Sequence, residues 1–136
     1  FDTAICVNVL EYASRPRELL AALHAALLAG GKLLVLVPQG PALYAGIDRA
    51  LGHQRRFKER ELRDLLTGAG FTVRRVYQLN KIGAPAWWLS GRVFRRRYIS
   101  KVTLKLFDKT VWFWRRIDGL LPWRGLSLVA VAVKED

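Results

Sequence analysis

The sequence of 136 residues has a single cysteine, no methionine, only two histidines and few acidic residues. Because Cys6 has no second cysteine to pair with, a disulfide within the chain is excluded, and a reducing compartment such as the cytoplasm is expected. No apolar run approaches the ~20 residues that a membrane-spanning helix needs. Low-complexity tracts and internal repeats are also absent, which excludes a largely disordered chain and a repeat protein. These absences leave a globular protein of one domain, or part of one.

Positive charge dominates the polar residues, with 23 Lys and Arg against 11 Asp and Glu and a formal net charge of +12. Such a charge attracts anionic partners, namely phosphorylated small molecules, anionic lipid head groups or nucleic acid. Because the sequence contains no recognisable RNA- or DNA-binding motif, nucleic acid is not the partner that we expect. A basic surface of solvated arginines, with no partner at all, accounts for the same composition.

Two apolar runs lie near the start of the chain, one over residues 4–7 and 9 and one over residues 33–37. Between them leucines recur at helical spacing, from Ser14, which can cap a helix, to Gly30, which can end it. The order strand, helix, strand predicts a parallel, right-handed βαβ unit. Because the first apolar run is continuous rather than alternating, it further predicts a strand that is covered on both faces.

The rest of the chain extends this pattern. Residues 58–69 predict a second amphipathic helix, and residues 71–77 and 127–133 predict two further strands. Residues 80–124 are dense in Trp and Arg and predict helices that are inserted before the last strand. Together the patterns predict an α/β sheet of at least four strands with helices on its faces.

The Trp- and Arg-rich segment over residues 80–124 fits three interpretations. It can form a lid over a substrate, an element at a membrane surface, or helices that only pack against the sheet. We favour a lid that also makes peripheral contact with the inner face of the membrane. The run Arg95, Arg96 and Arg97 is the predicted point of contact with anionic lipid.

Three segments carry a family resemblance, through their order and spacing more than through any one of them alone. Residues 1–11 open on Phe-Asp and end in Asn-Val-Leu-Glu, residues 27–33 contain Gly-Gly-Lys, and residues 61–71 end in Gly-Ala-Gly-Phe. Together they resemble class I S-adenosylmethionine-dependent methyltransferases of the type 11/12 kind. The resemblance implies a Rossmann-like sheet of which this chain holds strands four to seven, the last of them antiparallel. It also implies S-adenosylmethionine as the cofactor and transfer of its methyl group as the reaction.

The chain begins inside the first of these segments, so we expect it to be the C-terminal part of one methyltransferase domain and to be inactive alone. According to the resemblance, the Gly-rich loop and the acidic residue that hold the cofactor would precede Phe1. Residues 42–57 and 87–92 look like a subgroup in which a glycosyltransferase domain accompanies the methyltransferase, which implies a small-molecule or lipid-linked acceptor. The competing interpretation is a non-catalytic, basic and aromatic-rich module that binds anionic membrane or nucleic acid.

The end of the first strand supplies the candidates nearest to the cofactor. The resemblance places this strand end beside the methionine part of S-adenosylmethionine, so Asn8 and Leu10 are the predicted cofactor-binding residues. Glu11 and Tyr12 are predicted to line the acceptor pocket as catalytic residues, and Tyr12 stands where the family commonly has a histidine. The alternative for Glu11 is an ion pair with an arginine such as Arg55.

The segment after the second strand supplies the remaining candidates. Methyl transfer needs an oriented acceptor and, where that acceptor loses a proton, a general base, but it needs no metal. His53 is the predicted base, because His24 lies within the Ala-rich first helix. Guanidinium groups suit a phosphate or carboxylate on the acceptor. The predicted substrate-binding residues are Tyr44, Asp48, Arg55 and Arg56.

Overall fold

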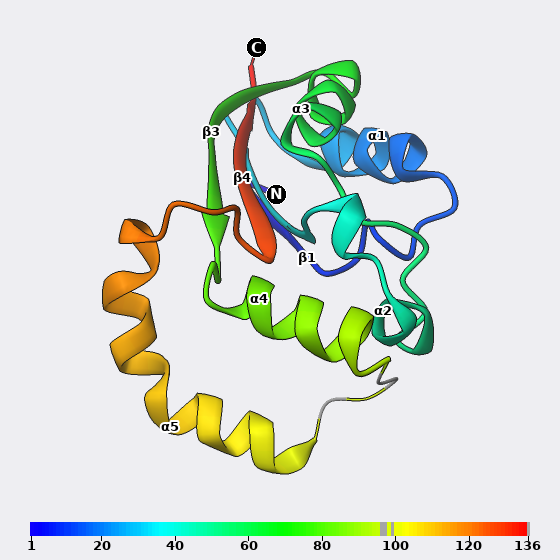
Figure 1. Ribbon diagram of the computed structural model, residues 1–136. Helices are drawn as coiled ribbons and strands as arrows, with labels where there is room; N and C mark the ends of the chain where they lie inside the picture. The colour runs from blue at the N-terminus through cyan, green and yellow to red at the C-terminus, as the bar shows by residue number, and fades with distance from the viewer. Residues whose placement is uncertain (96–97, 99, 136) are drawn as a thin grey trace.

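The computed structural model describes residues 1–95, 98 and 100–135, which form an α/β fold around a four-stranded sheet (Figure 1). The strands are β1 (Thr3–Val7), β2 (Lys32–Pro38), β3 (Phe71–Leu79) and β4 (Ser127–Lys134), in the spatial order β1-β2-β4-β3. β1 and β2 are parallel, whereas β4 lies between β2 and β3 and is antiparallel to both. The predicted α/β fold and the antiparallel last strand are confirmed, and the numbering of the strands as four to seven stays a prediction.

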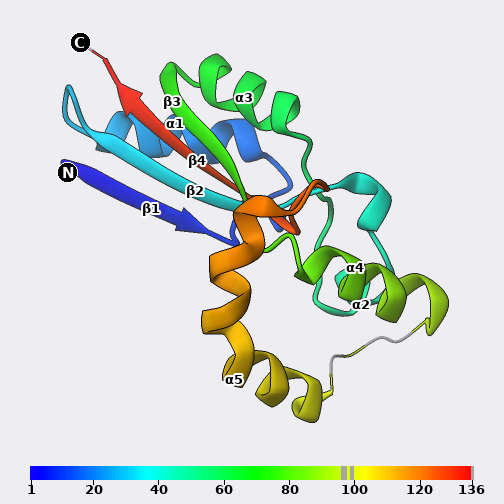
Figure 2. The ribbon, with the colours of Figure 1, turned by 60° about the vertical axis from the view of Figure 1, so that its left-hand side comes forward.

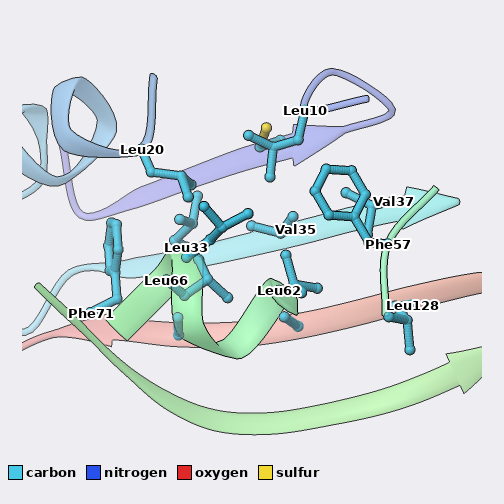
Figure 3. Close-up of a cluster of buried hydrophobic side chains, with 14 of the residues drawn as sticks. Leu10, Leu20, Leu33, Val35, Val37, Phe57, Leu62, Leu66, Phe71 and Leu128 are labelled. Carbon is cyan, nitrogen blue, oxygen red and sulfur yellow. The ribbon is translucent and has the colours of Figure 1, made fainter. Parts of the chain in front are cut away.

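Helices α1 (Pro16–Ala26) and α3 (Glu59–Gly68) pack on the same face of the sheet. Their buried leucines, Leu20 from α1 and Leu62 from α3, meet alternate residues of β2 such as Val35 in one hydrophobic core (Figure 3). The fixed φ of proline suits the first position of α1. The residue that caps α1 is Arg15, not the predicted Ser14, and its side chain makes no capping hydrogen bond.

The opposite face of the edge strand β1 is open. Cys6 is buried, but Ile5 is 68% exposed and Val7 is 44% exposed. Successive side chains of a strand point to opposite faces, so within the described residues only the face of β1 that carries Cys6 is covered. The prediction that this strand is covered on both faces is therefore wrong for the described chain.

The chain between β2 and α3, residues 39–57, forms a closed loop at the carboxyl ends of β1 and β2. It contains a 3₁₀ turn, η1 (Pro41–Leu43), and a short helix, α2 (Gly46–Ala50). The loop closes because the amide of Phe57 donates to Pro38 O at 2.9 Å and the amide of Gly40 donates to Phe57 O at 3.0 Å. The Phe57 side chain is fully buried, so hydrophobic packing anchors the same closure.

The chain between β3 and β4 is helical, as predicted, and its helices extend beyond the carboxyl ends of β1 and β2 (Figure 2). It comprises α4 (Gly83–Trp88), a π-helical turn η2 (Leu89–Val93), α5 (Lys101–Ile117) and η3 (Asp118–Leu120). Of the three predicted lipid-contacting arginines, Arg96 and Arg97 lie outside the described residues. Among the described residues, no helix combines the length and the apolar character needed to cross a membrane.

Candidate active site

The turn after β1 begins at Asn8, whose backbone has a left-handed conformation with φ of 51°. Asparagine tolerates this conformation better than most residues do. The backbone amide of Asn8 donates to Leu36 O at 2.9 Å. The side chain of Asn8 is exposed, whereas that of Leu10 is fully buried in the core. Of the two predicted cofactor-binding residues, only Asn8 therefore presents a side chain at the surface.

Hydrogen bonds join this turn to the end of the 39–57 loop. The Gln54 backbone amide donates to Glu11 O and its side-chain amide donates to Tyr12 O, both at 2.9 Å. Arg55 donates through Nη2 to Ala13 O at 3.3 Å. The predicted catalytic residues of the strand end and the predicted residues of the loop are thus brought to one place.

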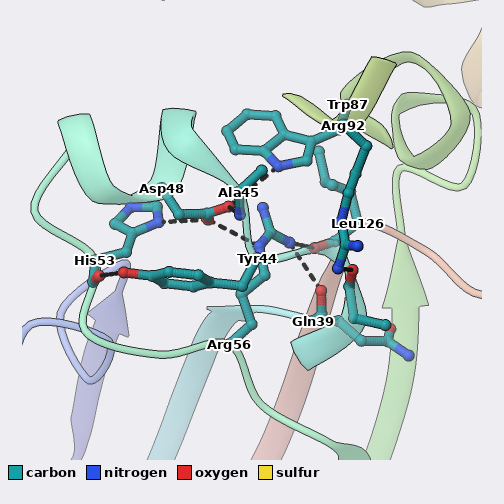
Figure 4. Close-up of polar contacts among 10 residues, drawn as sticks. Gln39, Tyr44, Ala45, Asp48, His53, Arg56, Trp87, Arg92 and Leu126 are labelled. Atoms are coloured by element: carbon teal, nitrogen blue, oxygen red, sulfur yellow. Dashed lines mark hydrogen bonds and ion pairs between the residues drawn. The ribbon is translucent and has the colours of Figure 1, made fainter. Parts of the chain in front are cut away.

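The centre of the site is the carboxylate of Asp48, which is fully buried and accepts four hydrogen bonds (Figure 4). Oδ1 accepts from Arg56 Nε at 2.8 Å and is 3.1 Å from His53 Nδ1. Oδ2 accepts from the Ala45 amide at 2.9 Å and from Trp87 Nε1 at 3.3 Å. A buried carboxylate needs such donors to offset its lost hydration, so Asp48 organises the loop around itself.

Arg56 neutralises Asp48 and extends the network to the sheet. Its side chain is 1% exposed and donates through Nη1 to Gln39 O at 2.8 Å and to Leu126 O at 3.4 Å. The guanidinium also lies 4.8 Å from the centre of the Trp87 ring, in cation–π contact. Burial lowers the pKa of Arg56 and the adjacent Asp48 opposes this shift. The pair is therefore a charged, buried ion pair that ties the loop to α4 and to the chain entering β4.

His53 is held by this ion pair in a defined tautomer. Asp48 faces Arg56 and accepts its hydrogen bond at 2.8 Å, so the carboxylate is ionised and can only accept; His53 Nδ1 must therefore carry the hydrogen. In the neutral ring Nε2 then has a free lone pair, which is the form that a general base requires. Tyr44 Oη donates to His53 O at 2.7 Å, and the Tyr12 ring meets the His53 ring edge-on with centroids 5.2 Å apart.

Glu11 is buried without a partner. Its residue is 0% exposed, and neither carboxylate oxygen has a hydrogen-bond partner among the described residues. The alternative in which Glu11 pairs with Arg55 is therefore wrong. Burial raises the pKa of the Glu11 carboxyl, and its own backbone amide and the nearby His53 and Arg56 only partly oppose this. A buried, unpaired carboxyl is costly to keep, which singles out Glu11 among the acidic residues of this site.

Replacing Glu11 with glutamine is expected to raise the free energy of unfolding at pH 8 by about 1 kcal/mol. Because the folded-state pKa is raised above its ordinary value of 4.5, the contribution of Glu11 to stability is full below that value and is lost as the pH rises through the folded-state pKa. Urea unfolding at pH 5 and pH 8 measures the free energy of unfolding at each pH. The difference between the two values should be smaller in E11Q than in the unchanged protein. The exposed Glu18, replaced in the same way, is the control. A loss of stability of E11Q at pH 8 would mean that a cation or donor binds Glu11, and would contradict the prediction.

The structure brings most of the predicted residues together but gives several of them protein partners. Asp48 and Arg56 bind each other in the interior, so contact of either with an acceptor stays a prediction. The sequence did not indicate that Trp87 donates a hydrogen bond to Asp48. It also did not indicate that Gln39 is buried, and the Oε1 atom of Gln39 has no hydrogen-bond partner among the described residues. The signal that could have flagged Gln39 is its place directly after a buried strand, where polar residues gather in parallel sheets.

The sheet order and its antiparallel strand define the fold of class I S-adenosylmethionine-dependent methyltransferases, and solved structures of that class match this chain. A methyltransferase from Thermotoga maritima matches with a TM-score of 0.63 at 18% identity, over 99% of this chain and 56% of that one. The Burkholderia thailandensis 1,6-didemethyltoxoflavin-N1-methyltransferase, solved with S-adenosylhomocysteine, matches with a TM-score of 0.53 at 21% identity, over 100% and 44%. The [4+2]-cyclase SpnF matches with a TM-score of 0.57 at 16% identity, over 99% and 50%.

This chain spans about half the length of each of these three proteins. No protein-family model and no curated protein matches the sequence. At such low identity the likeness establishes a shared fold, and a cyclase among the matches illustrates that one fold carries different reactions. Function must therefore be argued from the residues at the ends of the strands.

Proposed function

We propose that this chain forms the acceptor side of an S-adenosylmethionine-dependent methyltransferase. The observation that carries the proposal is the Asp48–His53 pair, which stands on the loop at the carboxyl ends of β1 and β2. In doubly wound sheets, ligands bind at the carboxyl ends of the strands. An oriented imidazole with a free Nε2 at that place is suited to remove a proton from an acceptor.

The residues at the end of β1 fit the amino-acid part of the cofactor. The exposed amide of Asn8 can both donate to a carboxylate and accept from an ammonium group. The buried, unpaired carboxyl of Glu11 is three residues away, and when it is ionised it favours a cation at this end of the sheet. S-adenosylmethionine, when bound, supplies a methyl group on a positively charged sulfur. The described residues offer no Gly-rich loop for its adenosyl part.

The proposed catalytic role of His53 is proton removal at Nε2 from the hydroxyl or amine of the acceptor. Asp48 fixes the ring through Nδ1 and stabilises the imidazolium that forms, while Arg56 binds the same carboxylate oxygen of Asp48. Tyr12, 44% exposed and in contact with the His53 ring, forms one wall of the acceptor site. The acceptor is a small molecule or a lipid-linked one, and a glycosyltransferase domain in the same polypeptide stays a prediction.

Calorimetric titration of S-adenosylhomocysteine into the native polypeptide that contains these residues tests the proposal. We expect micromolar affinity, and a loss of about 2–10-fold in N8G, the range for one or two lost hydrogen bonds. Glycine keeps the left-handed backbone, so this variant removes only the side chain. The matched control is N80G, because Asn80 also has a positive φ, of 59°, but lies directly after β3.

Two results would contradict the proposal. Absence of binding to the native polypeptide would favour the non-catalytic module, and equal losses in N8G and N80G would remove Asn8 from the cofactor site. The 136-residue chain titrated alongside is expected not to bind, because its described residues contain no Gly-rich loop for the adenosyl part.

A further inference from the structure

Helix α5 leaves much of its surface uncovered by the described protein. None of its residues is buried, and the hydrogen bond that fastens it to the rest of the described protein lies at its C-terminal end, where Asp118 Oδ1 accepts from the Ile82 amide at 3.2 Å. Beyond it, Trp123 Nε1 donates to Lys81 O at 2.6 Å. In Figure 1 the helix curves away from the sheet and lies apart from α4. A 17-residue amphipathic helix in this position needs a partner for the apolar residues that it exposes.

Only part of the apolar side of α5 is turned towards the protein. Phe107, Val111 and Trp114 face the end of β3 across a cavity of about 430 Å³. A second apolar set, here called the outer strip, consists of Val102, Leu106 and Phe113, which are 76%, 64% and 45% exposed. Their spacing of four and seven residues places them along one side of the helix. The outer strip is thus an apolar edge, interrupted between Leu106 and Phe113 by Lys109 and Thr110, that the described protein does not cover.

Next to the outer strip runs a row of cations at helical spacing, here called the basic row. Its members are Lys101, Lys105, Lys109 and Arg116, with the 63% exposed Trp112 among them. None of these cations forms an ion pair with a described carboxylate, and α5 contains one acidic residue, Asp108. The field of the basic row is therefore not neutralised within the part of the chain that the structure describes.

We propose that the outer strip and basic row of α5 dock on the head-group layer of an anionic lipid membrane. A helix lying in that layer inserts its apolar edge among the acyl chains while lysines and arginines beside it reach the lipid phosphates. Tryptophan prefers the same boundary. Nucleic acid would bind the basic row through its phosphates and stack on Trp112, but it would leave the aliphatic Val102 and Leu106 in water. A membrane contacts the cations and also buries these apolar side chains, so it fits more of the surface. This inference stands independently of methyl transfer.

Co-sedimentation of the native polypeptide with vesicles tests the docking. We expect binding to vesicles of phosphatidylcholine and phosphatidylglycerol in equal parts, weak binding to phosphatidylcholine alone, and a loss of binding at high salt. The double variant K105E/K109E is expected to lower partitioning at least about tenfold, because each basic residue near an anionic surface contributes on that order. The variant L106S/F113S is expected to lose a similar amount through the apolar edge.

The control has the same change of net charge at a different place. R17E/R60E alters exposed residues of α1 and α3, away from α5, and should keep most of the binding. All three variants change exposed residues, so circular dichroism should show them folded. Absence of binding by the native polypeptide, or an equal loss in R17E/R60E, would overturn the proposal. Binding to a single-stranded oligonucleotide but not to vesicles would also overturn it.

Discussion

Replacing Asp48 with alanine is expected to lower the free energy of unfolding by about 3–5 kcal/mol, the range for removing one partner of a buried ion pair. The change leaves the Arg56 guanidinium, 1% exposed, with carbonyl oxygens, the Trp87 ring and the nearby Glu11 carboxyl, which does not hydrogen-bond to it. It also deprives His53 Nδ1, the Ala45 amide and Trp87 Nε1 of their shared acceptor. Most of the cost arises from the uncompensated charge, because the attraction within such a pair roughly offsets its desolvation.

Chemical denaturation of D48A and of two further variants measures this loss in the free energy of unfolding. The double variant D48A/R56M removes the unpaired charge and should recover a large part of the lost stability. The control is D64A, because Asp64 is an exposed partner of Arg60 at 3.9 Å and such pairs contribute at most about 1 kcal/mol. A loss below 1 kcal/mol in D48A would show that Arg56 finds another anion.

Replacing Phe57 with alanine is expected to cost about 3–5 kcal/mol, the usual range for deleting a fully buried phenylalanine side chain. Phe57 fills the core below the carboxyl end of β2, next to Val37 and Leu10 (Figure 3). Its backbone closes the 39–57 loop through its hydrogen bonds with Pro38 and Gly40. The variant therefore leaves a cavity at the point where the loop is fastened to the sheet.

Thermal and urea unfolding of F57A, F57L and F113A distinguish the cost of a cavity in the core from the cost of losing an exposed phenylalanine. The leucine variant keeps most of the volume and should lose less than about 1.5 kcal/mol. Phe113 lies on α5 and is 45% exposed, so its replacement by alanine should change stability by no more than about 0.5 kcal/mol. If F57A and F113A cost the same, the core below the loop does not have the packing described.

The strands and main helices were predictable because each carries its own local signal. Continuous apolar runs predicted β1 and β2, and leucine spacing between a cap and a glycine predicted α1 to within a few residues. The order β1-β2-β4-β3 has no local signal and was not predicted; the family resemblance implied only that the last strand is antiparallel. An apolar run is the same whether one face or both faces of a strand are covered, which is why the exposure of Ile5 was missed.

The candidate site was predictable as a group of residues but not as a network. His53, Asp48 and Arg56 were flagged because polar residues on a loop at the end of a parallel strand are candidates by position. The burial of Asp48 and Arg56 was not predicted, because charged residues are rarely buried and nothing in the sequence marks the exceptions. Trp87 is 39 residues from Asp48 along the chain, so only tertiary packing brings its indole to the carboxylate.

One carboxylate serves both the loop and the helical segment. Asp48 accepts from His53 and Arg56 within residues 39–57, and from Trp87 on α4. If α4 moves away from the loop, Asp48 Oδ2 loses a donor and the negative charge facing His53 is less well balanced. The loop at the strand ends and the helical segment beyond it are therefore coupled through a single buried carboxylate.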